Sequence, residues 1–192
     1  MVIDWFLPKY DVNYVCEASV DAPPEETYAA IRETNLKDPV IDFLFTLREL
    51  PLRIARRWRG EPPTPAAPKV TFADVTEGPG WVSLADEPGV EFVVGSVGRF
   101  WRKDYGGRKV TPDEFVPFAE PGYAKLALSL AVRPAGGGTI LRYEARTATT
   151  DEAARRAFCR YWRLIGPGVG LVMRRALHRI KAEAERRALV PA

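Results

Sequence analysis

The chain has 192 residues, of which 46% are hydrophobic and 28% are charged, a balance typical of an ordinary globular protein with a sizeable core. No stretch approaches the roughly 20 consecutive apolar residues of a membrane span, and the first ten residues lack the basic start and apolar run of a secretory signal. Two isolated cysteines, Cys16 and Cys159, favour free thiols in a reducing compartment over a disulfide framework. We therefore expect one domain over residues 1–192, located in the cytoplasm.

Charge is unevenly distributed along the chain. The net charge is +3, but the residues from Asp151 to the end include ten Lys or Arg and only four Asp or Glu. A solvated outer helix face explains this excess, and a basic surface for a membrane or a nucleic acid is the alternative. No aromatic residues alternate with basic ones as they do in nucleic-acid-binding motifs, so we expect no nucleic-acid partner.

The first third of the chain predicts one strand and two helices. Apolar and polar residues alternate over residues 11–20, as in a half-buried strand. Residues 21–33 begin Asp-Ala-Pro-Pro-Glu-Glu, which favours a helix because its first turn tolerates proline and attracts acidic side chains. A second short helix is predicted over residues 41–50. A basic amphipathic piece over residues 52–59 either folds its arginine stems over apolar surface or contacts a membrane.

The middle of the chain predicts a series of strands separated by glycine- and proline-rich turns. The predicted strands cover residues 70–75, 80–85, 90–101, 114–118, 123–132 and 139–147.

The faces of these strands follow from alternation. Leucines at every second position of residues 126–130 share one face, whereas Lys125 and Ser129 point to the other. This pattern predicts an antiparallel sheet with one apolar face and one wet face. If Glu91 marks the wet outer face, Arg99 and Trp101 share it. Glu144 and Arg146 are likewise interpreted as outer-face residues in cross-strand pairs.

A single long amphipathic helix is predicted from Asp151 to Arg187, with Asp151 as its N-terminal cap. Its apolar stripe requires a partner, and the concave face of the sheet is the natural one. Pro167 interrupts the helical pattern with three glycines around it. Either the helix bends there to follow the sheet, or small residues keep a cavity open and let the helix move.

The order of these elements resembles the START-like superfamily of helix-grip folds, also called SRPBCC, which includes lipid-transfer START domains, birch-pollen-type allergens, aromatic polyketide cyclases and coenzyme-Q-binding proteins. The general marks are residues 20–31 and the helix after Thr147-Ala-Thr-Thr-Asp151. Residues 95–101, 141–146 and 161–167 are similar to an uncharacterised bacterial branch. The resemblance implies an α+β helix-grip fold. In it a curved antiparallel sheet of about six to seven strands wraps around the C-terminal helix, and two short helices follow the first strand.

The resemblance also implies an internal cavity for an apolar, lipid-like or polyketide-like small molecule, but it implies no reaction. Apolar lining with few polar groups is usual for such cavities. The residues that we expect to line it are Phe92, Val94, Phe100, Leu126, Leu128, Leu141, Tyr143, Trp162, Ile165, Val169 and Met173.

Catalytic signals are weak. The one histidine, His178, lies near a basic helix end without a Gly-x-Ser-x-Gly elbow, and no metal-ligand spacing is present, so we expect neither a cofactor nor a metal. Binding or carrying a small molecule is the first hypothesis. A cyclase or dehydratase, with Tyr143 as proton donor and Arg99 polarising a carbonyl, is the second. A peripheral membrane or partner-binding module that uses the basic piece over residues 52–59 is the third.

Overall fold

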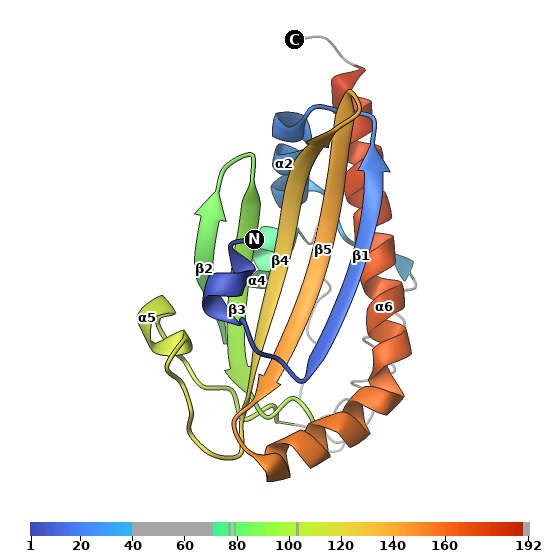
Figure 1. Ribbon diagram of the computed structural model, residues 1–192. Helices are drawn as coiled ribbons and strands as arrows, with labels where there is room; N and C mark the ends of the chain where they lie inside the picture. Colours follow the sequence, from blue (N-terminus) through green and yellow to red (C-terminus); the bar gives the residue numbers. More distant parts are fainter. Residues whose placement is uncertain (40–70, 77, 79, 103, 190–192) are drawn as a thin grey trace, which may run out of the picture.

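The computed structural model describes residues 1–39, 71–76, 78, 80–102 and 104–189. Its centre is an antiparallel five-stranded sheet with the strand order β1-β5-β4-β3-β2 (Figure 1). The strands are β1 (Val12–Val20), β2 (Trp81–Glu87), β3 (Glu91–Gly98), β4 (Ala124–Ala135) and β5 (Gly138–Thr149).

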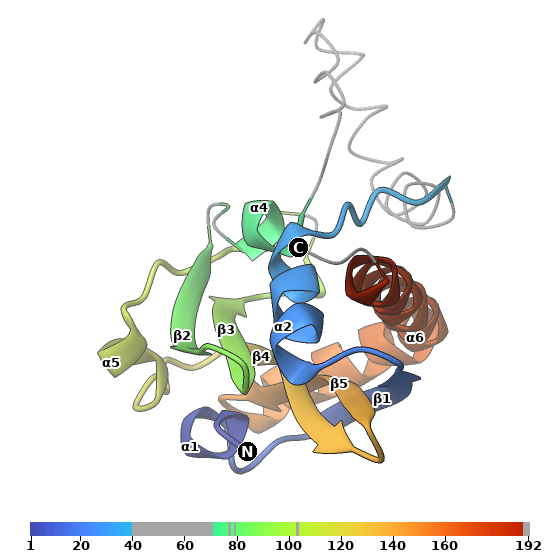
Figure 2. The ribbon, with the colours of Figure 1, turned by 90° about the horizontal axis from the view of Figure 1, so that it is seen from above.

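Helices cover both faces of this sheet. Figure 2 shows α2, α4 and α6 on one face, called the inner face below, and α1 on the opposite, outer face. The described helices are α1 (Ile3–Phe6), α2 (Pro24–Glu33), α4 (Phe72–Thr76), α5 (Pro112–Phe115) and α6 (Glu152–Ala188). As predicted, the Asp151 side chain caps α6 by accepting a hydrogen bond from the Ala154 amide at 2.8 Å. The predicted helix-grip fold is therefore confirmed.

Two predicted strands were wrong, which lowers the strand count to five in the described part of the chain. The predicted strand over residues 70–75 overlaps α4, and the one over residues 114–118 overlaps α5. A reciprocal cap starts α5, because the Thr111 hydroxyl accepts from the Glu114 amide and the Glu114 carboxylate accepts from the Thr111 amide. Thr71 and Asp74 exchange the same two bonds at the start of α4. The predicted helix over residues 41–50 and the basic piece over residues 52–59 lie outside the described residues.

The expectation that the outer face is wet was also wrong. A second apolar cluster is buried there, formed by Ile3, Leu7, Leu84, Val93, Val97, Phe115, Tyr123 and Ala127. The carboxylate of Glu91, only 2% exposed, accepts hydrogen bonds from the Val2 and Ile3 amides at 2.7 and 3.2 Å. A negatively charged hydrogen-bond acceptor at the start of α1 satisfies backbone amides that have no partner within the helix. Glu91 thus fastens the N-terminal segment over the outer face.

The long helix α6 bends around the edge of the sheet, with Pro167 inside it (Figure 1). This supports the interpretation that proline lets the helix follow the curved sheet. The glycine at position 170 is required for a different reason, namely the space available for a side chain. A Cβ atom at this position would collide with the Tyr14 hydroxyl and lie 2.9 Å from the Tyr14 ring carbon Cε2. Glycine therefore lets α6 approach β1 more closely than a side chain would allow.

Candidate functional site

The strand register aligns inner-face side chains into rows, three of which cross the whole sheet from β1 to β2. The first row contains Cys16, Tyr143, Leu130, Phe92 and Asp86. The second contains Tyr14, Ala145, Leu128, Val94 and Ser83. The third contains Val12, Thr147, Leu126, Ser96 and Trp81. The second and third rows contain no charged side chain, whereas Asp86 at the β2 end of the first row pairs with Arg32 of α2 at 2.5 Å.

Burial decreases from the first row to the third. Phe92, Leu130 and Tyr143 of the first row are all buried, and they pack with Phe72 of α4 and Met173 of α6 in one core cluster. The Phe72 ring meets the Phe92 and Tyr143 rings edge-on, with centroids 5.8 and 6.0 Å apart. In the third row, by contrast, every member except Thr147 is partly exposed. Incompletely buried apolar side chains on the concave side of the sheet are where a ligand would gain most contact.

The helix α6 repeats this gradient. Met173 is buried towards its C-terminal half, whereas Trp162, Ile165 and Val169 in its first half are only partly buried. Trp162 stacks on the buried Phe158 ring at a centroid distance of 5.8 Å. Trp101, which follows the end of β3, meets Phe158 edge-on at 6.4 Å. The side chains of Trp101, Phe158 and Trp162 thus form a cluster of aromatic rings.

The eleven predicted lining residues separate into three sets. Five are fully buried core residues: Phe92, Val94, Leu141, Tyr143 and Met173. Five are partly buried and remain candidates for ligand contact: Leu126, Leu128, Trp162, Ile165 and Val169. Phe100 lies outside any strand, because β3 ends at Gly98 and a turn follows.

The turn after β3 also changes one predicted orientation. Trp101 was expected on the outer face, but its contact with Phe158 places it on the side of α6. Arg99 is on the outer face as expected, since its guanidinium lies 4.3 Å from the centroid of the Tyr123 ring and donates to the Gly122 carbonyl at 3.1 Å. Tyr143 lies in the inner-face cluster, so the Tyr143 and Arg99 side chains are on opposite faces of the sheet and cannot act together on one substrate.

Four inner-face residues were missed as lining candidates: Tyr14, Cys16, Trp81 and Thr147. The alternation in residues 11–20 had already placed Tyr14 and Cys16 on one face of a strand. What was missing was the pairing of β1 with β5, which sets Cys16 beside Tyr143 and Tyr14 beside Ala145. That pairing joins the strands that come first and last along the chain, so no local sequence pattern encodes it.

Burial affects two titratable groups of the first row, Cys16 and Tyr143. Burial raises the pKa of the Cys16 thiol to about 11, although the charges of Arg174 and Arg142 oppose the shift. Burial also raises the pKa of the Tyr143 hydroxyl above its ordinary value. The Tyr14 hydroxyl accepts a hydrogen bond from Arg174 Nη1 at 2.6 Å. The strand side chains of the second and third rows carry no charge, which suits a largely apolar ligand.

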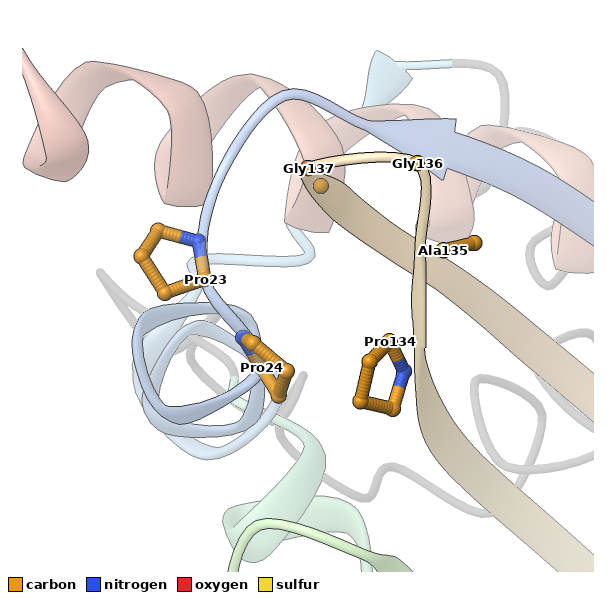
Figure 3. A pocket seen from close by; sticks show the side chains of 7 residues that line it. Pro23, Pro24, Pro134, Ala135, Gly136 and Gly137 are labelled. Atoms are coloured by element: carbon orange, nitrogen blue, oxygen red, sulfur yellow. The ribbon is translucent and has the colours of Figure 1, made fainter.

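Surface depressions formed by described residues include two that lie outside these rows. The first lies where α2 starts beside the turn between β4 and β5, between the proline rings of Pro23, Pro24 and Pro134 (Figure 3). The second lies on the outer face and is bordered by Val90, Ile140 and charged side chains. The first offers prolines and a glycine turn without converging polar side chains, so we assign no ligand to it.

No group of three or more His, Cys, Asp and Glu side chains among the described residues could hold a metal ion. No described helix is both long enough and apolar enough to cross a membrane.

No family model matches the sequence, and no curated protein is similar enough to count as a relative. Solved structures with a related arrangement include protein MLL2253 from Mesorhizobium loti, at 14% identity over 93% of this chain and 100% of that one, with a TM-score of 0.42. The di-domain ARO/CYC StfQ from the steffimycin biosynthetic pathway is 14% identical over 93% of this chain and 52% of its own length, with a TM-score of 0.36. Ara h 8.0201 is 11% identical over 90% of this chain and 97% of that one, with a TM-score of 0.34. Similarity at these levels carries no argument about activity.

Proposed function

We propose that this protein binds an apolar or aromatic small molecule between the second and third rows of the sheet and the first half of α6. The observation that carries the proposal is a set of partly exposed, uncharged side chains on the inner face and in the first half of α6, of which Tyr14, Leu128 and Val169 pack against one core cluster. The set is Tyr14, Leu126, Leu128, Trp162, Ile165 and Val169. Apolar surface left incompletely buried on a concave face gains roughly 25 cal/mol per Å² when a ligand covers it.

The polar groups nearby are few and of the kind that orient a ligand without demanding a charge. Ser96 and Thr147 lie in the third row, and the Ser96 hydroxyl already donates to the Gly80 carbonyl at 2.8 Å. Carrying or sensing a lipid-like or polyketide-like molecule is consistent with this lining. No described arrangement of an acid, a base and a nucleophile favours a particular reaction, so binding is the function that we propose.

The test is whether ligand uptake depends on the space in front of α6. We expect Val169→Trp to fill part of that space and to weaken binding of an apolar fluorescent probe such as anilinonaphthalene sulfonate, together with any small molecule that co-purifies in native mass spectrometry. Leu164→Trp is the matched control, because Leu164 is 82% exposed on the opposite side of the same helix. Equal probe affinity in both variants, with unchanged circular dichroism, would contradict the proposed location.

A further inference from the structure

The helix α6 has a second, outward face, which meets the proposed ligand site at Arg174, since Arg174 Nη1 donates to the Tyr14 hydroxyl at 2.6 Å. Its residues recur at steps of three and four, which places them on one side of an α-helix. All of them are exposed, and we call them the basic stripe: Arg156, Arg160, Arg163, Leu164, Pro167, Leu171, Arg174, Arg175 and His178. From Arg156 to His178 the stripe is roughly 33 Å long at 1.5 Å per residue.

The charge of this stripe is of one sign. Between Ala153 and Ala182, α6 carries eight Lys or Arg residues and no Asp or Glu. Part of this charge is already paired at the ends of the stripe, since Arg156 lies 3.5 Å from Glu152 and Arg175 lies 3.1 Å from Asp38. In the described part of the chain, no ion pair or hydrogen bond engages the side chains of Arg160 and Arg163.

Exposed apolar side chains lie between these cations. Leu164 is 82% exposed and follows Arg163 directly, and Leu171 lies two turns further along the same face. A single exposed leucine is ordinary on a protein surface. Two leucines and a proline in line with unpaired arginines form a surface that combines apolar contact with positive charge.

We infer that the basic stripe docks the protein onto a lipid surface that carries anionic headgroups. Such a surface supplies phosphate or carboxylate groups for Arg160 and Arg163 and an acyl boundary for Leu164 and Leu171. A nucleic-acid backbone would satisfy the arginines but not the leucines, and the stripe has no aromatic side chain on which bases could stack. This inference does not depend on what binds inside the fold.

The experiment uses the full chain and vesicles of phosphatidylcholine with or without phosphatidylserine, separated by flotation. We expect binding to the anionic vesicles alone, and we expect it to be lost at about 1 M salt, where the screening length falls to about 3 Å. Arg160→Glu/Arg163→Glu should weaken binding by at least about 25-fold, because each cation near an anionic surface contributes about fivefold. Leu164→Gln should weaken it by about tenfold or less, according to how deeply the side chain inserts.

The matched control is Lys109→Glu/Arg133→Glu, in exposed positions outside the stripe. Both double variants replace two cations by two anions, so both lower the net charge of +3 by four. The proposal predicts that the control variant keeps vesicle binding at low salt. Equal losses in the two variants would reduce the effect to overall charge and overturn the proposal. Wild-type protein that ignores anionic vesicles, or that binds duplex or single-stranded nucleic acid in preference to them, would overturn it as well.

Discussion

The buried charges of the outer face allow a quantitative test of how this fold is held together. The Arg146 side chain is 8% exposed and that of Glu144 is 1% exposed, and Arg146 Nε donates to Glu144 at 2.7 Å. Arg146 Nη1 also lies 2.7 Å from an Asp4 carboxylate oxygen and donates to the Leu7 carbonyl at 3.1 Å. Arg146→Met preserves much of the side-chain volume but removes all of these bonds, leaving Glu144 with Arg142 at 2.9 Å.

The expected cost follows from the charge that remains. Removing one partner of a buried ion pair costs about 3–5 kcal/mol, because the other charge stays buried without compensation. The remaining bond to Arg142 places our expectation near the lower end, at about 3 kcal/mol. The double variant Glu144→Met/Arg146→Met removes both charges, and it should therefore be clearly more stable than Arg146→Met alone. A loss of about 3 kcal/mol is large against a typical total of about 5–15 kcal/mol.

Urea denaturation followed by circular dichroism measures these differences. Arg133→Met is the control, since Arg133 is exposed on β4 and a surface substitution of this kind changes stability by about 0.5 kcal/mol or less. The reasoning would be refuted by an Arg146→Met loss below about 1 kcal/mol, or by a double variant as unstable as the single one.

The pH dependence of the same variants gives an independent check. Burial raises the pKa of Glu144, but hydrogen bonds from Arg146 and Arg142 outweigh it and hold the pKa below its ordinary value of 4.5. A carboxyl group with a lowered folded-state pKa contributes its full stability above the unfolded-state pKa, and that contribution is lost as the pH falls through the folded-state value. The wild-type advantage over Arg146→Met should therefore shrink as the pH falls below about 4.5. A gap that is constant with pH would exclude Glu144 as its source.

Two further predictions concern the inner face. Gly170→Ala should be less stable than Gly166→Ala by about 1–3 kcal/mol in thermal or urea unfolding, because the methyl group at position 170 meets the Tyr14 ring, whereas a Cβ atom at Gly166 would be 3.2 Å from its nearest neighbour. Helix propensity alone favours both substitutions by about 1 kcal/mol. Equal stabilities of the two variants would therefore contradict the close approach of α6 to β1. Cys16 should react slowly with iodoacetamide near neutral pH, since burial raises its pKa to about 11, and faster in urea; equal rates in the two states by peptide mass mapping would disprove the shielding.

The elements with strong local signals were predicted correctly. Alternation identified β1, β4 and β5, and the three- and four-residue spacing with the Asp151 cap identified α6. The strand predictions over residues 70–75 and 114–118 are wrong because a Thr-x-x-Asp or Thr-x-x-Glu pattern caps a short helix in each segment. Such a capping pattern is a local signal of the sequence.

The candidate site could be predicted only in part, since periodicity assigns a residue to a face but does not say how far that face is filled. Leu128 and Leu130 share one face of β4, yet Leu130 is fully buried and Leu128 is not. Both leucines contact one core cluster, which includes Met173 and Phe72 from segments distant in the sequence, so the local pattern of β4 does not decide how far each is covered.

The sequence by itself determined the inward and outward sides of β1, β4 and β5, the long helix α6 and its excess of positive charge, because these depend on neighbouring residues and on the fixed periods of helix and strand. Only the tertiary structure decided that Glu91, Glu144 and Arg146 are buried on the outer face. Their burial depends on α1, which the Glu91 carboxylate and the Arg146 guanidinium hold against the sheet. Polar alternation marks the side of a strand that can meet water, but whether it does so depends on which other segment the chain folds over it.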